Sequence, residues 1–413
     1  MFDAGATGLA AILGAGIFAV IAAAAGVAGP SLWVSLLIAA CVAFCNALSS
    51  AQLAAVYPRT GGTYEFGRRA MGQWWGFGAG WMFLAANTFG PGVIALTFGA
   101  YFHAVIPEVP SRAAAVLAAL GMTTLNALGI RRSVRVTDVV VVLSIVSLLS
   151  VVVIGLPEGR LSNLTPFASG GVGGVLQATA LLFFAYTGYS RIATLVEEVR
   201  NPKRTIPRAT VIALSTATIL YLAVAFTVLT VLGAAGVSES LSPLQSAMVA
   251  VSSGTGVAIV IVGALLTTFN EGLSDLLGVS RVAFAMARQS DLPVGMARLG
   301  VSQNPWRSVL VVGAISIVVA GFAPFVTAIA ISSFGTLLYY TVTNLSALRL
   351  VKEQRSFPRV LALAGLIGCL GLAFSLSRQD VTFGLGILAI GLAYRGLRLK
   401  GGKSKDGAKQ SGG

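Results

Sequence analysis

The sequence predicts an all-α polytopic membrane protein with twelve transmembrane helices. Of the 413 residues, 56% are hydrophobic and only 10% are charged, and the mean hydropathy is +0.87. No charged side chain occurs between Ala4 and Pro58, a stretch long enough for two crossings of about 20 apolar residues each. The 49 glycines suit membrane helices, which pack closely through small residues. These observations exclude a soluble globular domain and favour a helical bundle over a single anchor.

Hydropathy and the spacing of the charges place the expected helices in one membrane domain at 1–400, followed by a disordered cytoplasmic tail at 401–413. Helices 1–5 are expected within 5–156, helices 6–10 within 174–350, and helices 11–12 within 358–397. The individual spans are 5–27, 31–57, 74–105, 113–129, 136–156, 174–197, 209–234, 245–285, 308–323, 326–350, 358–376 and 381–397. The stretch 245–285 is too long for one perpendicular span, so part of it must be tilt or loop.

Basic residues are concentrated in alternate loops and produce the net charge of +14. The opposite loops hold only Arg112, Arg160 and Arg378. Because cytoplasmic loops carry an excess of lysine and arginine, both termini of this multi-pass cell-membrane protein are expected in the cytoplasm. The clusters are interpreted as topology determinants that contact anionic lipid, and no nucleic-acid partner is expected. The clusters are Arg59, Arg68 and Arg69; Arg131, Arg132 and Arg135; Arg200, Lys203, Arg204 and Arg208; Arg288, Arg298 and Arg307; Arg349, Lys352, Arg355 and Arg359.

The sequence contains no pattern for a metal or a cofactor. Cys41, Cys45 and Cys369 all fall inside expected spans and are interpreted as packing residues. His103, the only histidine, lies near the outer end of the third span and is interpreted as structural. The first span follows the initiating methionine without a basic segment or a cleavage site, so it is expected to be a retained helix.

Two spans contain glycines that interrupt a helix. The first holds Gly14-Ala15-Gly16-Ile17-Phe18 at mid-depth, and the sixth holds the run from Phe183 to Ser190 with Gly188. Glycine lets the backbone leave the helix and present free N–H and C=O groups, which a membrane tolerates only where they line a cavity or bind something. Corresponding breaks in two five-helix halves predict a binding site at the repeat interface. In the alternative interpretation, the glycines only allow close helix packing.

Four segments resemble the amino acid–polyamine–organocation superfamily of transporters. They are Gly14-Ala15-Gly16-Ile17-Phe18; Tyr57-Pro58-Arg59-Thr60-Gly61-Gly62-Thr63-Tyr64; Phe183 to Tyr189 followed by Glu197 to Ala209; and Ser280-Arg281 with Ala285 to Arg288 and Leu292-Pro293. The ordered matches extend over nearly the whole chain and identify it as similar to an amino acid permease. The resemblance implies a five-plus-five inverted repeat (the LeuT-like fold) with helices 1 and 6 broken, two further helices, and alternating access around a central site.

The resemblance also implies how an amino acid would bind. Its carboxylate would be held by the N–H groups of Ala15 and Gly16. Its ammonium would be held by carbonyl groups at the two breaks, those of Ile12 on helix 1 and of Phe184 and Thr187 on helix 6. The aromatic residues of the sixth helix would pack on the substrate or act as a gate, with plain core as the alternative for each. The predicted substrate-binding residues are Ile12, Ala15, Gly16, Phe184, Tyr186, Thr187, Gly188, Tyr189 and Asp275.

The chain departs from the superfamily at positions that concern coupling. Ser144 stands where the proton-coupled members have a lysine in helix 5, which argues against coupling through an ammonium there. A hydroxyl at Ser144 could join a sodium site or leave the carrier an exchanger, so coupling to sodium, coupling to protons and exchange all stay open. Ser190 and Gln52 replace acids that many members carry.

Two acids in the eighth span, Glu271 and Asp275, are four residues apart and therefore share one helix face. A carboxylate at membrane depth is costly unless it is paired, hydrated or protonated, so its default interpretation is functional. The match to helix 8 places Asp275 at the substrate wall and Glu271 near the coupling-ion position. Three interpretations stay open: the acids bind a cationic substrate, they titrate during transport, or they pair with Arg281 or water as structure.

The functional hypothesis is a secondary active transporter of amino acids, with a polyamine or other amine carrier as the alternative. A membrane enzyme is rejected because no nucleophile–base pair, phosphate loop or metal cluster accompanies the acids. A non-transporting sensor or assembly protein with the carrier fold is the alternative from another class. The expected partners are a small-molecule substrate and the lipid bilayer, with no obligatory protein partner. Asp138, Glu197 and Glu198 predict an ion-pair network with the cytoplasmic basic loops.

Overall fold

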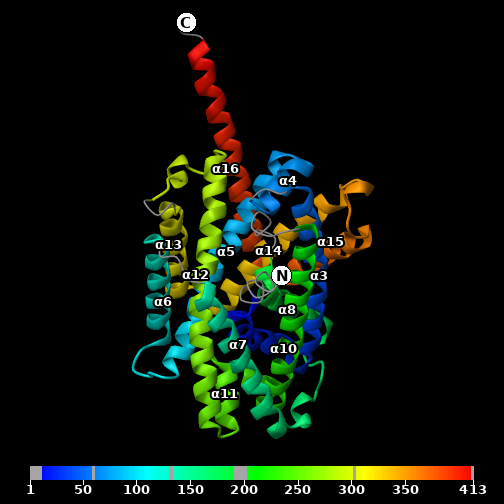
Figure 1. Ribbon diagram of the computed structural model, residues 1–413, viewed down its shortest axis with the longest axis vertical. Coiled ribbons are helices and arrows are strands. Elements are labelled where there is room, and N and C mark those ends of the chain that lie inside the picture. Colours follow the sequence, from blue (N-terminus) through cyan, green and yellow to red (C-terminus); the bar gives the residue numbers. More distant parts are fainter. Residues whose placement is uncertain (1–11, 58–60, 130–133, 190–201, 301–303, 411–413) are drawn as a thin grey trace.

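The computed structural model describes residues 12–57, 61–129, 134–189, 202–300 and 304–410. Every regular element in these ranges is a helix, and most long helices run along the long axis of the molecule (Figure 1). The first half contains η1 (Gly16–Val20), α2 (Ile21–Ala28), η2 (Gly29–Ser31), α3 (Leu32–Val56), α4 (Thr63–Met71), α5 (Gln73–His103), α6 (Ser111–Ala127), α7 (Val134–Gly155), η3 (Leu156–Glu158) and η4 (Leu161–Leu164). The second half contains α8 (Gly171–Leu182), η5 (Phe183–Tyr189), α10 (Pro202–Glu239), α11 (Pro243–Ala250), α12 (Gly254–Arg288), η7 (Val294–Ala297), α13 (Trp306–Phe322), α14 (Phe325–Leu348), η8 (Lys352–Gln354), α15 (Arg359–Ala373) and α16 (Arg378–Gln410).

Eight helical segments in the described part are long and apolar enough to cross a membrane. The outer surface of α7 illustrates their surroundings, because Val139, Val142 and Val153 are each more than half exposed. Large apolar side chains gathered on a surface in this way are unfavourable in water but are accepted by lipid hydrocarbon. The chain is therefore an integral membrane protein, as the sequence predicts. The total of twelve spans stays a prediction, and residues 5–11 of the first expected span lie outside the described residues.

The long apolar stretch at 245–285 is resolved into two helices. α11 ends at Ala250 and α12 begins at Gly254, with Ser252 between them at a positive φ of 54°. The side-chain oxygen of Ser253 accepts a hydrogen bond from the N–H of Gly256 and so caps the start of α12. The expected loop component of this stretch is therefore a tight turn at its beginning, and α12 is one long helix.

The last helix continues farther than the sequence indicates. Residues 401–413 are expected to be disordered, whereas α16 extends to Gln410 and projects beyond the bundle toward the C-terminus (Figure 1). A helix that is already formed adds residues without a new nucleation cost, so a polar continuation can stay helical. Residues 411–413 lie outside the described residues.

The centre of the bundle is formed by helices that carry the predicted site. α5 packs against α6, α12, α13 and α14, while η1 contacts η5, and α2 contacts α8 and α10. Pro91 lies inside α5 and removes one backbone hydrogen bond from this helix. The segments of the first and sixth spans thus meet in the interior, beside α5 and α12.

Close helix packing depends on glycine at the contact between α5 and α6. A Cβ atom on Gly99 would stand 2.1 Å from the carbonyl oxygen of Ser111, which is a backbone atom and cannot rotate away. Gly78, in the same helix α5, has nothing within 4 Å of its Cβ position.

We expect Gly99→Ala to lower the free energy of unfolding by about 1–3 kcal/mol, because the added methyl group forces the two helices apart. Gly78→Ala is the matched control, since both substitutions gain the same helix propensity and only one creates a clash. Thermal unfolding of the detergent-purified proteins measures the difference. Equal melting temperatures for the two variants would contradict the assigned contact.

Candidate functional site

The candidate site begins where the first described segment leaves α-helical geometry. Leu13 and Gly14 form a bend, and the chain continues as the π-helix η1. The sixth segment changes from α8 to the 3-10 helix η5 over Phe183–Tyr189. A Cβ atom on Gly16 would stand 2.4 Å from the Cα atom of Ala185, so the two irregular segments touch backbone to backbone. Glycine at this position permits the contact.

The bend at Gly14 receives a side chain from a distant part of the chain. The N–H of Ala15 donates a hydrogen bond of 2.7 Å to Oε2 of Glu271, which lies 256 residues later in α12. A Cβ atom on Gly14 would stand 2.1–2.3 Å from the three atoms of the Glu271 carboxyl group. The carboxyl group of Glu271 therefore occupies the space that the missing side chain of Gly14 leaves, against the predicted carboxylate-binding N–H.

Two carbonyl groups that the sequence assigns to ammonium binding accept hydrogen bonds from hydroxyl groups of the protein. The Tyr221 hydroxyl in α10 donates to the carbonyl of Ile12 at 2.7 Å, and the Thr187 hydroxyl donates to the carbonyl of Phe184 at 2.9 Å. A carbonyl oxygen has two lone pairs, so that of Ile12 can accept a second donor. The carbonyl of Phe184 lies within the 3-10 helix η5, where the N–H three residues later is its second donor. Backbone carbonyl groups of both irregular segments thus find hydroxyl partners within the protein.

Asp275 lies one helical turn from Glu271, on the side of α12 that faces α5. A Cβ atom on Gly90 of α5 would stand 2.8 Å from Oδ2 of Asp275 and 4.0 Å from the ring of Phe184. Both acids keep part of their surface accessible although α12 packs against α5, α6, α7 and α13. The structure therefore brings Glu271 to the first-helix bend, and Asp275 to the neighbourhood of Phe184.

The other two aromatic candidates point elsewhere. The ring of Tyr186 lies 5.6 Å from that of Tyr221, and the ring of Tyr189 stacks at 5.3 Å on that of Tyr340 in α14. Both tyrosines are fully buried. They form the packing that supports η5, whereas Thr187 and Gly188 in the same turn keep some accessible surface.

Ser144 lies in the interface between α7 and α12. Its hydroxyl donates to the carbonyl of Val140 at 2.7 Å and contacts the hydroxyl of Thr267. Thr267 is one turn before Glu271, so the two predicted coupling residues border the same stretch of α12. Over the described ranges, no group of three or more histidine, cysteine, aspartate or glutamate side chains that could hold a metal ion occurs.

Two surface hollows lie away from these residues. One is apolar and includes Trp33, Val152 and Phe226, and the other is formed by the first residues of α16 around Arg378. Neither contains a predicted site residue. The Nδ1 atom of His103 lies 2.8 Å from the carbonyl oxygen of Val109 in the following turn, and its structural role stays a prediction.

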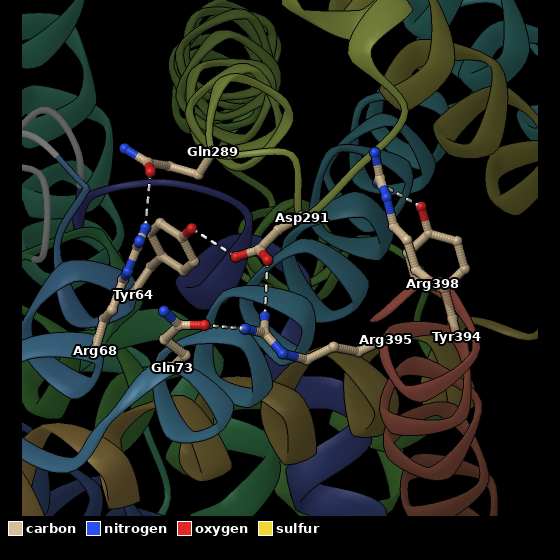
Figure 2. A network of polar contacts seen from close by, with 8 residues as sticks. All are labelled: Tyr64, Arg68, Gln73, Gln289, Asp291, Tyr394, Arg395 and Arg398. Atoms are coloured by element: carbon tan, nitrogen blue, oxygen red, sulfur yellow. Dashed lines mark hydrogen bonds and ion pairs between the residues drawn. The ribbon is translucent and has the colours of Figure 1, made fainter. Parts of the chain in front are cut away.

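A buried polar network joins helix ends on the side of the bundle that carries α4 (Figure 2). Asp291, just after α12, accepts a hydrogen bond of 2.6 Å from the Tyr64 hydroxyl and pairs with Arg395 of α16 at 2.8 Å. The guanidinium group of Arg395 also lies over the rings of Trp74 and Phe77 of α5, at 5.3 and 4.8 Å. Burial, together with the hydrogen bond to Asp291, raises the pKa of the Tyr64 phenol, so it stays protonated as a donor.

This network differs from the predicted one. The sequence assigns Asp138, Glu197 and Glu198 to a cytoplasmic ion-pair network; Asp138 is exposed, and the two glutamates lie outside the described residues. The prediction did not include Arg395. The sequence did contain a signal for it, since Arg395 is a basic residue inside the last apolar span, 381–397. Its partner Asp291 carries no comparable signal, since it belongs to a polar loop.

Comparisons with known proteins identify the family of this chain. The model of the amino acid permease family matches residues 1–384. An uncharacterised transporter of Mycobacterium tuberculosis is 41% identical over 96% of this chain and 90% of its own length. The branched-chain amino acid permease BcaP of Bacillus subtilis is 26% identical, with coverage of 90% and 84%. The low-affinity putrescine importer PlaP of Escherichia coli is 28% identical, with coverage of 84% and 82%.

The helical membrane bundle and these relatives define a transporter of small molecules rather than an enzyme. The chain belongs to the amino acid permease family. The resemblance noted in the sequence is thereby confirmed, as are its location in a membrane and its class of small-molecule substrate. The individual site residues stay predictions.

We expect Arg395→Met to lower the free energy of unfolding by about 3 kcal/mol, because it leaves the largely buried carboxylate of Asp291 without its cationic partner. Arg398→Met, one turn later, is the control: its guanidinium group donates only to the Tyr394 hydroxyl among the contacts in Figure 2, so a loss below about 1 kcal/mol is expected. Thermal unfolding of the detergent-purified protein distinguishes them. Comparable losses in both variants would show that the buried pair has no special role.

Proposed function

We propose that the protein is a secondary active transporter that moves amino acids or closely related amines across the cell membrane by alternating access. One observation carries the proposal: two segments that depart from α-helical geometry touch at Gly16 and Ala185, with two acids of α12 next to them. Backbone groups released at membrane depth need polar partners. Such a place suits a small polar guest.

The proposed architecture is a five-plus-five inverted repeat with helices 1 and 6 broken. The bend at Leu13 and Gly14 lies near the start of the first half, and η5 lies near the start of the second. Equivalent positions of the two irregular segments support this assignment. α15 and α16 would then be the two additional helices, and alternating access would proceed around the contact between η1 and η5.

Within this site, we assign the binding of the substrate to groups at the two breaks. The N–H groups of Ala15 and Gly16 and the carbonyl groups of Ile12, Phe184 and Thr187 are the backbone candidates. Among the aromatic side chains, Phe184 is the candidate for direct contact because its ring lies near Asp275. Tyr186 and Tyr189 would act through the packing of η5.

Coupling is proposed to involve a cation or the exchange of substrates. Ser144 carries a hydroxyl that faces Thr267 on α12, in place of a lysine ammonium. Ser144 and Glu271 are the candidate coupling residues, since both border the same stretch of α12. Counterflow with and without a sodium or pH gradient separates symport from exchange.

A polyamine or other amine carrier is the second candidate. The observation that favours it is the presence of Glu271 and Asp275 on one face of α12, beside the two irregular segments. Paired carboxylates attract cations, and one relative is named a putrescine importer. A non-transporting sensor with the same fold would bind such compounds without moving them, so flux in proteoliposomes separates it from either carrier.

We expect Gly16→Ala to reduce substrate counterflow at least tenfold, because the added methyl group collides with Ala185 where the two segments must move relative to each other. The control is Gly26→Ala in α2, whose nearest neighbour, Ser238, would be at an ordinary contact distance of 3.5 Å. Size-exclusion chromatography confirms that both variants are folded. Full counterflow in the Gly16 variant would remove this contact from the transport cycle.

The topology proposed here places both termini in the cytoplasm. Arg349 at the end of α14 donates to the carbonyl of Ala70 at the end of α4, which brings two basic regions to one end of the bundle. Arg112 donates to Gly321 and Ala323, and the N–H of Arg160 donates to Thr230, at helix ends that would face outward. Arg59, Arg131, Arg132 and Arg200 lie outside the described residues.

We expect a fluorescent protein fused after Gly413 to fluoresce in intact bacteria, and alkaline phosphatase at the same position to be inactive, because phosphatase folds only outside the cytoplasm. Phosphatase inserted after Arg160 should be active. Activity in the reverse pattern would invert the proposed orientation.

A further inference from the structure

The first-helix bend already holds a carboxyl group. Glu271 accepts the hydrogen bond of the Ala15 N–H at 2.7 Å, within the range of hydrogen bonds to a charged acceptor. Its carboxyl atoms fill the space beside Gly14, where any larger residue would collide with them. A fitted space and a direct hydrogen bond from two distant segments indicate that this placement is built into the fold.

A substrate carboxylate would need the same place. An α-carboxylate that approached Ala15 would compete with Glu271 for one donor and would stand against another negative charge. Two carboxylates that share one hydrogen-bond donor repel each other strongly where water is scarce. Of the two N–H groups predicted to hold a substrate carboxylate, that of Ala15 is therefore engaged by the protein itself.

The remaining groups of the site suit a cation. Asp275 follows one turn later, near the ring of Phe184, and a carboxylate and an aromatic face both attract an ammonium group. The carbonyl group of Ile12 also has a second lone pair beside the Tyr221 hydroxyl that it already accepts. Arg281, the nearest arginine along α12, is exposed on the surface of that helix.

We infer that Glu271 is a resident carboxylate that takes the position of the carboxylate of an amino acid, so that the site selects amines without a free carboxylate group. Glu271 is then the residue that determines substrate class. This inference rests on the proposed function, whose site it refines.

Pairs of compounds that differ only in the carboxylate test the inference: putrescine with ornithine, isopentylamine with leucine, and phenethylamine with phenylalanine. Calorimetry on the full-length detergent-purified protein measures each dissociation constant. In the wild-type protein, at least one amine should bind at least tenfold more tightly than its amino acid. In Glu271→Ala, which frees the N–H of Ala15 and removes the charge, that ratio should fall at least tenfold.

A second Glu271 variant and a control variant complete the test. Glu271→Gln preserves the size of the side chain and an oxygen that can accept the Ala15 hydrogen bond, so it reports the contribution of charge if the alanine variant fails to fold. Gly278→Ala, in the same helix and with nothing within 4 Å of its Cβ position, should leave the ratio unchanged.

The inference is overturned if the wild-type protein binds an amino acid as tightly as its amine or binds none of the six compounds. It is also overturned if both Glu271 variants keep the wild-type ratio. Counterflow of the bound compounds in proteoliposomes tests the proposed function separately. Binding with the expected preference but without counterflow would reject transport and leave the role of Glu271 in selection intact.

Discussion

The structure depends on the need to satisfy backbone polar groups deep within an apolar bundle. Water is scarce there, so a peptide group that leaves the helical pattern must find a partner in the protein or in a guest. Side chains provide partners at the first bend and at η5: Glu271 of α12 for Ala15, Tyr221 of α10 for Ile12, and Thr187 of η5 itself for Phe184. Each holds an irregular segment in place. The same groups belong to the proposed substrate site, where stability and recognition would share one set of atoms.

Much of the fold was accessible from the sequence because membrane helices have a strong local signal. Long apolar stretches located the helices, and the glycines at 14, 16 and 188 pointed to segments that depart from α-helical geometry. Glu271 and Asp275 stood out because acids at membrane depth are costly. What the sequence could not provide was the partner of each group. The hydrogen bond from Ala15 to Glu271 spans 256 residues and depends on how α12 packs against η1.

The packing partners of the aromatic residues of η5 could not be predicted from the sequence either. Phe184, Tyr186 and Tyr189 are close in sequence, yet Tyr186 lies against Tyr221 of α10 and Tyr189 stacks on Tyr340 of α14, because different helices pack around η5. The length of the last helix was also beyond a local pattern, since α16 continues through a polar sequence that composition alone assigns to a disordered tail. Local composition specifies whether a segment is apolar, while packing decides which neighbour it meets.

The carboxylate of Asp291 has a mechanical consequence. It holds Tyr64 of α4 and Arg395 of α16, and Arg395 in turn lies against two aromatic rings of α5. α4, α5 and α16 are therefore linked to the end of α12 at one point, and the four helices should behave as a single rigid body. In a rocking motion that opens the bundle, the remaining helices would then move, while the linked helices would stay fixed relative to one another.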